Sequence, residues 1–560
     1  MTVTRLTTAA MRLALLACPW TTAAAQWQAD AGPRSAALGA PVGGSIERYL
    51  RAAAVAGRMH PLPTAARGLL PAELRAAMLA DSTPHPWRAA LLQATRDRRA
   101  AGAQLFVSAN SSMPWGANDG AMWQGRGLNA ALGAGAVFET RHLTALAAPA
   151  LAFSQNAGFP LMPQFFPERL SDLVDPQYTE VVDLPQRRGI RPETRLLPGE
   201  SSLRVSAFGL TAGISSASEG WGPGETFPAI LGANAGGFSR IFAGTNAAGV
   251  RLGPFGTLSA RYVLGVLEQS NWSIVTATDT FASITASGRR RMATGLSASF
   301  TPAALQALEI GATRFYHLPW RGSGRQWTGW AKPFSGLFSG DEVLGPAAAD
   351  SISNQLGSLF IRVRVPKARL ETTVELLRDD YNYSGRDLVQ EPENNGALLS
   401  SVRIATSSSA SAISLLTIEL FDGDIRPIAQ QRPQGALYTN GSLLQGHTSD
   451  GQLLGAPIGA GVVSGQRVAW ERFTATGSRR IALQRWRPRS VVITDVEGLY
   501  RPPPVIIPKA YDWLYDLSAA TLDQRGAASR SLEVGALYAG VWQLRRTAWN
   551  VYARASTTIF

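Results

Sequence analysis

The segment Leu359-Phe360-Ile361-Arg362-Val363-Arg364-Val365 is the clearest case of alternating apolar and polar residues in this 560-residue chain. Its odd-numbered positions are apolar and share one face of an extended strand, whereas Arg362 and Arg364 point the other way. In a soluble sandwich the apolar face would be covered by a second sheet. In a membrane barrel it would face lipid, and the arginines would line a wet lumen. This strand alone therefore leaves both architectures open.

The connections between strands favour the barrel. A tight Pro366-Lys367-Ala368 turn leads into the next alternating strand, residues 370–376. Similar short links lie at 253–256, 301–303, 407–411 and 476–478, and long links lie at 269–289, 317–356, 378–396 and 421–465. Short periplasmic turns alternating with long extracellular loops are typical of outer-membrane proteins, so residues 102–560 are predicted to form an all-β, transmembrane antiparallel β-barrel of about 18 strands.

The C-terminus is consistent with this topology. The last predicted strand pair, 529–543 and 549–560, runs up and back down, which places Phe560 on the periplasmic side. A terminal aromatic residue on the last strand resembles the signal by which the barrel-assembly machinery recognises its clients. We therefore expect that machinery and outer-membrane lipid as partners.

The first 25 residues have the features of a cleavable secretory signal. Arg5 and Arg12 supply positive charge, an apolar core covers 13–17, and three alanines at 23–25 precede Gln26. This predicts export to the cell outer membrane, because the sequence contains no apolar run long enough for a spanning helix. The only cysteine, Cys18, lies within the signal, so the mature chain would contain neither a disulfide nor a thiolate metal site. A lipoprotein box at 15–18 is the alternative interpretation.

The net charge is +13, and two arginines of it belong to the signal. A basic excess indicates nucleic acid, anionic lipid or an acidic polymer as a partner. Because the chain is predicted to be exported, we expect no nucleic-acid partner.

Residues 26–101 have a helical rather than a strand pattern. Candidate helices cover 46–51, 71–79 and 87–98, and Pro71 suits a helix start. We predict an N-terminal periplasmic segment with short helices and interpret it as a small accessory bundle rather than a DNA-binding helix pair.

Several unusual motifs lie in the long links and in the first half of the chain. They are 118–123 (Asn-Asp-Gly-Ala-Met-Trp), 183–189, 198–202, 219–225 (Glu-Gly-Trp-Gly-Pro-Gly-Glu), 378–395 and 446–459. Together they resemble the Wzi family of outer-membrane capsule-assembly proteins, over most of residues 45–490. One departure is Gly220, where the family often has a tryptophan before Trp221.

The resemblance implies a barrel with a periplasmic helical bundle that acts as a lectin and attaches capsular polysaccharide of the group 1 type. It implies no enzymatic activity. Sugar rings stack on aromatic side chains, and their hydroxyl and acidic groups bind Asp, Asn and Arg. The candidate polysaccharide-binding residues on this basis are Trp221, Trp320, Arg321, Arg325, Trp327, Trp330, Asp380, Tyr381, Asn382 and Arg386.

These candidates have structural alternatives. The tryptophans of 320–330 could form an aromatic girdle at the membrane interface, and the loop carrying Trp221 could fold inward and plug the lumen. The candidates for a charged lumen network are Arg362, Arg364, Glu371, Glu375 and Glu391.

Two further functions remain open at this point. One is a channel or transporter. The other is an outer-membrane glycosidase that uses carboxylates among Asp379, Asp380, Glu391 and Glu393, for which the lumen network is the favoured interpretation. The five histidines have no metal-ligand spacing, so we expect no metal site and no cofactor.

Overall fold

The computed structural model describes residues 30–160, 182–272, 290–320, 324–334, 353–379, 396–423, 437–440, 443, 445–461, 463–487, 513–541 and 546–560. The helices are η1 (Pro33–Leu38), α2 (Ser45–Val55), α3 (Pro71–Ala80), α4 (Arg88–Ala94), η2 (Ala303–Leu305), η3 (Gly324–Phe334) and η5 (Pro366–Ala368). The strands of the first half are β1 (Arg99–Asn110), β2 (Gly127–Glu139), β3 (Leu143–Ala147), β4 (Ala150–Ser154), β5 (Glu193–Leu197), β6 (Ser202–Ala207), β7 (Leu210–Ser215), β8 (Arg240–Thr245), β9 (Val250–Arg251), β10 (Gly256–Glu268), β11 (Arg290–Pro302) and β12 (Leu308–Pro319). Those of the second half are β13 (Asn354–Val365), β14 (Leu370–Asp379), β15 (Gly396–Ser408), β16 (Ala412–Asp422), β17 (Thr448–Ser449), β18 (Gln452–Leu453), β19 (Ser464–Thr474), β20 (Gly477–Arg487), β21 (Trp513–Arg525), β22 (Ala528–Val541) and β23 (Arg546–Ile559).

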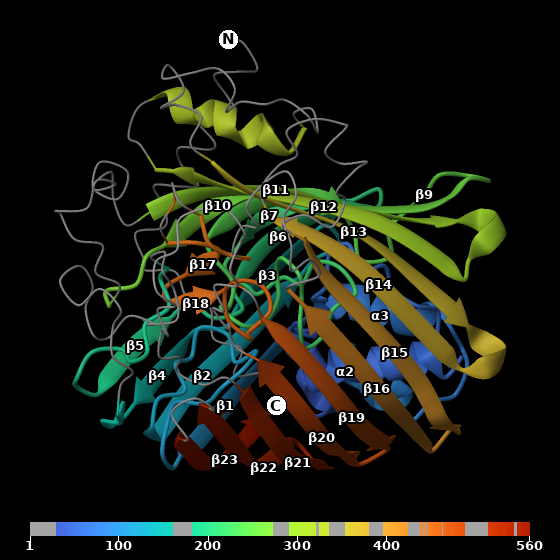
Figure 1. Cartoon of the computed structure of the whole chain (residues 1–560). Coiled ribbons are helices and arrows are strands. Elements are labelled where there is room, and N and C mark those ends of the chain that lie inside the picture. The colour runs from blue at the N-terminus through green and yellow to red at the C-terminus, as the bar shows by residue number, and fades with distance from the viewer. Residues whose placement is uncertain are drawn as a thin grey trace, which may run out of the picture.

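All strands except β17 and β18, which form a separate two-stranded sheet, build one closed antiparallel wall (Figure 1). The pairs β3 and β4, β5 and β6, and β8 and β9 each act as one interrupted strand of this wall. With these pairs counted once, the described residues form an 18-strand barrel, as the sequence predicted. Strand β23 closes it by pairing with β1, with Ile559 opposite Ala103 and Tyr552 opposite Asn110.

The wall is apolar outside and polar inside. Leu359 and Ile361 are 64% and 49% exposed on the outer face of β13, whereas Arg362, the next residue along the strand, is 5% exposed and points into the lumen. This alternation confirms the pattern predicted from the sequence and is that of a transmembrane barrel. Within the described part of the chain, none of the helices has the length and apolar character needed to cross a bilayer.

The two ends of the barrel differ in their connections. Tight turns join β6 to β7, β9 to β10, β11 to β12, β13 to β14 and β21 to β22, and all of them lie at one end. Phe560 lies at the same end, where its backbone N–H donates to the carbonyl oxygen of Ala527 at 3.2 Å. We refer to this end as the short-turn end and to the opposite one as the long-loop end.

The N-terminal helices confirm the predicted helical segment and lie inside the barrel near its short-turn end (Figure 1). Tyr49 of α2 stacks on Trp87 at 4.3 Å, and both rings pack edge-on against Phe473 of β19. The same apolar cluster includes Ile413 and Leu415 from the inner face of β16. The helical segment therefore fills the lumen at this end.

A second segment, residues 216–239 between β7 and β8, also folds into the lumen. The carboxylate of Glu419 on β16 accepts backbone N–H bonds from Glu225, Thr226 and Phe227 at 3.1, 2.8 and 2.7 Å. Arg403 on β15 pairs with the same carboxylate at 3.3 Å. Glu419 therefore fastens this segment to the wall.

We expect Glu419→Ala to destabilise the barrel by about 3–5 kcal/mol, because it leaves Arg403 buried without this partner and frees three backbone donors. The measurement is the temperature at which the folded, fast-migrating form is lost on a gel. Glu268→Ala is the matched control, since Glu268 pairs with an arginine whose side chain is 50% exposed, and exposed pairs contribute at most about 1 kcal/mol. Equal shifts for the two variants would contradict this account.

Candidate functional site

A cavity of about 300 Å³ lies at the long-loop end of the barrel. It is enclosed by four loops, which join β1 to β2, β4 to β5, β7 to β8 and β16 to β19, and by the upper part of β20. Its principal lining residues are Trp115, Asp119, Trp123, Gln124, Gln452 and Trp486.

The loop from β1 to β2 contributes most of the lining, and one asparagine organises it. The side-chain amide of Asn110, the last residue of β1, donates to the carbonyl oxygens of Trp115, Gln124 and Gly125 at 3.1–3.2 Å. Asn118 adopts φ +57° at the turn of the loop, a backbone region that asparagine tolerates. The loop is therefore held in one shape from its base to its tip.

Three tryptophans give the cavity its aromatic surface. Trp115 and Trp486 lie 4.8 Å apart between ring centroids and are 8% and 4% exposed. Trp123 is half-buried, and the guanidinium of Arg188 lies 5.4 Å from its ring. Ring faces of this kind are the surfaces on which apolar faces of small ligands stack.

Polar atoms without partners accompany these rings. Buried atoms of five lining residues have no hydrogen-bond partner among the described residues: Asp119 Oδ2, Trp123 Nε1, Gln124 Nε2, Gln452 Oε1 and Trp486 Nε1. A buried polar group left unpaired costs about 1–3 kcal/mol, so such groups are rarely gathered in one place. Here they include both donors and acceptors.

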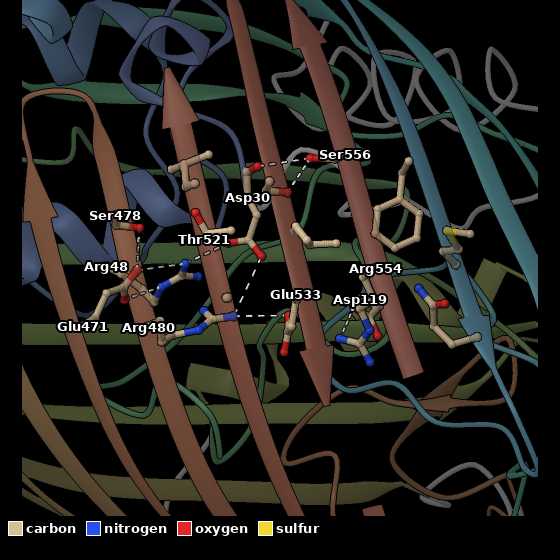
Figure 2. A pocket seen from close by; sticks show the side chains of 17 residues that line it. Asp30, Arg48, Asp119, Glu471, Ser478, Arg480, Thr521, Glu533, Arg554 and Ser556 are labelled. Atoms are coloured by element: carbon tan, nitrogen blue, oxygen red, sulfur yellow. Dashed lines mark hydrogen bonds and ion pairs between the residues drawn. The ribbon is translucent and has the colours of Figure 1, made fainter. Parts of the chain in front are cut away.

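Beneath the cavity the lumen is charged. Asp119 also lines two smaller cavities, of about 60 and 120 Å³, that extend along β19 to β23. Figure 2 shows the first of these, in which Arg554 pairs with Asp119 at 3.5 Å and Arg480 with Glu533 at 3.3 Å. Burial raises the pKa of Asp119 to about 6, although the charge of Arg554 opposes the shift.

A buried hydrogen-bond chain docks the loop that supplies Gln452. His447 Nε2 bonds the carbonyl oxygen of Ile230 at 2.7 Å, and its Nδ1 lies 2.8 Å from His317 Nε2. Arg291 Nη1 lies 3.2 Å from His317 Nδ1, and its Nη2 donates to the carbonyl oxygen of Thr448 at 2.6 Å. Both imidazoles are neutral in this arrangement, because each accepts one bond and donates the other. Burial lowers the pKa of His447 to about 3.

Those of the predicted polysaccharide-binding residues whose side chains the structure describes do not line this cavity. Trp221 has no exposed surface and packs edge-on against Phe315 at 5.8 Å, which favours the plug interpretation of its loop. Trp320 is half-buried beside Leu318, and Trp330 is 48% exposed on η3. The predictions at Arg321, Asp380, Tyr381, Asn382 and Arg386 lie outside the described residues, as do the side chains of Arg325 and Trp327.

Four of the five residues predicted for a lumen network are described, and they point inward. Arg362 pairs with Glu309 at 2.5 Å and lies 3.6 Å from Glu371, and Glu375 accepts a bond from Ser358 Oγ at 2.6 Å. Arg364 donates to the carbonyl oxygen of Gln306. Glu391 lies outside the described residues.

The sequence interpretation did not select the residues that line the cavity. Asp119 and Trp123 belong to a motif that carried the family resemblance, and Gln452 lies within another, so those motifs were the available signal. For Trp486 the only available signal was its inward-facing position on β20. Its proximity to Trp115 depends on loop packing that the sequence does not reveal.

The fold and the cavity define this protein as a transmembrane β-barrel with a filled lumen and an aromatic cavity at its long-loop end. Among solved structures it is similar to Wzi of Escherichia coli, an outer-membrane protein involved in group 1 capsule assembly and a carbohydrate-binding β-barrel. The TM-score is 0.60 at 13% identity, over 93% of this chain and 98% of that chain. This likeness confirms the predicted resemblance at the level of the fold.

Other comparisons give weaker matches. OccK7 of Pseudomonas aeruginosa matches with a TM-score of 0.38 at 10% identity, over 83% of this chain and 99% of that chain. OccAB3 of Acinetobacter baumannii matches with a TM-score of 0.39 at 8% identity, over 82% and 98%. No protein-family model matches the sequence, and no curated protein matches it either.

The buried hydrogen-bond chain through His447 and His317 predicts that the loop at 445–461 is sensitive to acid. Because the pKa of His447 is lowered in the fold, its contribution to stability is fully present above its ordinary value of 6.5 and is lost as the pH falls towards about 3. We expect hydrogen exchange in this loop to accelerate over that range. His447→Gln keeps a donor for Ile230 but cannot titrate there, so its exchange should vary less with pH. An unchanged profile in this variant would rule out the histidine as the cause.

Proposed function

We propose that this protein is a non-enzymatic lectin-like barrel that holds capsular polysaccharide at the cell surface. The observation that carries the proposal is the cavity at the long-loop end, where three tryptophans meet buried polar atoms that have no partner among the described residues. Apolar C–H faces of a sugar ring stack on indole rings, and the ring hydroxyls take up the donors and acceptors.

The position of the cavity supports this function. It lies at the end opposite Phe560 and the tight turns, which is the extracellular end in an outer-membrane barrel. Its volume of about 300 Å³ is small for a ligand site, so it would hold a short piece of a long polymer. That the similarly folded Wzi binds carbohydrate agrees with this use of the fold.

Binding is favoured over hydrolysis by the set of lining groups. Glycosidases use two carboxylates that flank the scissile bond. Among the described residues that line the cavity, Asp119 is the only carboxylate. Asp119 would therefore orient or repel a ligand rather than share catalysis with a second acid.

A direct test compares polysaccharide binding by the purified wild-type barrel and Trp123→Ala, with a panel of uronic-acid-containing and neutral capsular polysaccharides as ligands. Stacking contributes about 0.5–1.5 kcal/mol, so binding should weaken by up to about tenfold. Trp549→Ala is the matched control, because Trp549 is 61% exposed on the outer wall. Equal affinities of Trp123→Ala and wild type, or the absence of binding to every polymer, would overturn the proposal.

For an acidic polysaccharide, affinity should depend on Asp119. Its pKa is raised to about 6, so the carboxyl is charged at neutral pH and becomes neutral as the pH falls below that value. Neutralisation removes a repulsive charge from the lining of the cavity. We therefore expect tighter binding below pH 6 in wild type and a flatter profile in Asp119→Asn, measured by titration at each pH. Binding that weakens on acidification in wild type would exclude this role.

A further inference from the structure

Helix η3 lies on the outer surface of the barrel rather than in a loop above the lumen. Side chains from the outer face of three adjacent strands bond its carbonyl oxygens. The hydroxyl of Tyr262 on β10 donates to Trp330 at 2.9 Å, that of Thr294 on β11 to Trp330 at 3.4 Å, and Arg314 on β12 to Pro333 at 3.3 Å. Figure 1 shows the helix above β10 and β11, outside the wall.

The contact between η3 and the wall is tightly packed. Met292 and Leu318 face outward on β11 and β12, yet they are 4% and 8% exposed. A Cβ added to Gly329 would lie 2.2 Å from Met292 Cε, so the helix backbone rests directly on the wall at this glycine. The helix therefore satisfies polar groups that would otherwise face lipid, and it covers apolar ones.

Helix η3 also carries exposed aromatic residues. Trp330 is 48% exposed and Phe334 is 59% exposed, and the Phe334 ring stacks on Tyr262 at 5.6 Å. Below the helix, the outer wall continues with exposed apolar side chains such as Ile310, which is 46% exposed. The aromatic face is thus continuous with the lipid-facing belt. Tryptophan at the boundary of such a belt is typical of the membrane interface.

On this side of the barrel the apolar surface extends to the tips of the short turns. Phe208, Phe255 and Leu305 lie in three successive turns and are 100%, 74% and 59% exposed. The apolar surface between these turns and η3 extends only a short way along the strands, because Arg314 already lies under the helix. The belt on the side of β6 to β12 is therefore displaced towards the short-turn end.

On the side of β19 to β23 the belt is displaced the other way. Arg472 and Arg479 are opposite each other on β19 and β20, face outward and are exposed just above the turn. Arg530 has the same position on β22. At the other boundary, Tyr538 and Trp549 stack at 4.4 Å close to the long-loop ends of their strands. On this side the apolar belt begins on the long-loop side of the arginines and ends at the long-loop ends of the strands.

We propose that η3 lies in the outer leaflet interface of the membrane and that the barrel is seated obliquely, with lipid as the occupant of both surfaces. Trp330 and Phe334 then contact the acyl boundary, and Phe208, Phe255 and Leu305 enter the periplasmic leaflet. Arg472, Arg479 and Arg530 lie at the phosphate level on the opposite side, where phosphates add negative charge to that of Asp523, which pairs with Arg479 at 2.9 Å. This inference is independent of polysaccharide binding, because the cavity and η3 share no lining residue.

Single-cysteine labelling tests the proposal on the full barrel. Cys18 is the only cysteine, so Phe334→Cys, Phe255→Cys, Arg530→Cys and Lys367→Cys are each made in a Cys18→Ala background and spin-labelled. All four positions are exposed, and folding is checked by the heat-dependent gel shift. Each variant is placed in phosphatidylethanolamine and phosphatidylglycerol vesicles, and collision with oxygen is compared with collision with a water-soluble nickel chelate.

The ratio of collision with oxygen to collision with nickel should be severalfold higher for the labels at residues 334 and 255 than for the label at Lys367. Lys367 lies in a polar turn tip exposed to water. The label at residue 530 should give an intermediate ratio. A label at residue 334 that collides with nickel as readily as that at Lys367 would overturn the interfacial position of η3. Equal ratios at 255 and 367 would overturn the oblique seat.

Discussion

The barrel is closed by the backbone hydrogen-bond ladder between β23 and β1. Inside a bilayer an unpaired strand edge costs several kcal/mol per unsatisfied group, so the first and last strands of the wall must pair. Closure fixes one face of every strand towards lipid and the other towards the lumen. Polar and charged side chains on the inward face are thereby enclosed in the lumen, where each needs a partner.

The interior meets that requirement with parts of the chain that are not wall strands. Glu419 and Arg403 fasten the 216–239 segment, and α2 contributes Arg51, which donates to the carbonyl oxygen of Pro223 at 2.9 Å. The long loops then pack on this filling and converge at the long-loop end. The cavity proposed to bind sugar therefore depends on the segments that fill the lumen, because the loops that line it are held in place by buried partners.

The sequence predicted the wall well because lipid and lumen impose a strict period of two, which segments such as 359–365 display openly. It also predicted the helices of the N-terminal segment from their local pattern. The cavity could not be predicted in the same way, because Trp115 and Trp486 are 371 positions apart and meet only after the loops fold. Trp330 shows a further limit. Its residue type suits both sugar stacking and the membrane interface, and only the direction in which η3 lies separates the two.

The residues that begin the described chain lie against strands that end it. The backbone N–H of Gly32 donates to Ser529 Oγ at 2.6 Å, and Ser556 Oγ donates to the carbonyl oxygen of Asp30 at 3.3 Å. Contacts across nearly the whole sequence are slow to form, because a very large loop must close first. The N-terminal residues emerge first, yet they gain these partners only when the last hairpin arrives, so enclosure of the lumen and completion of the wall become a single late event.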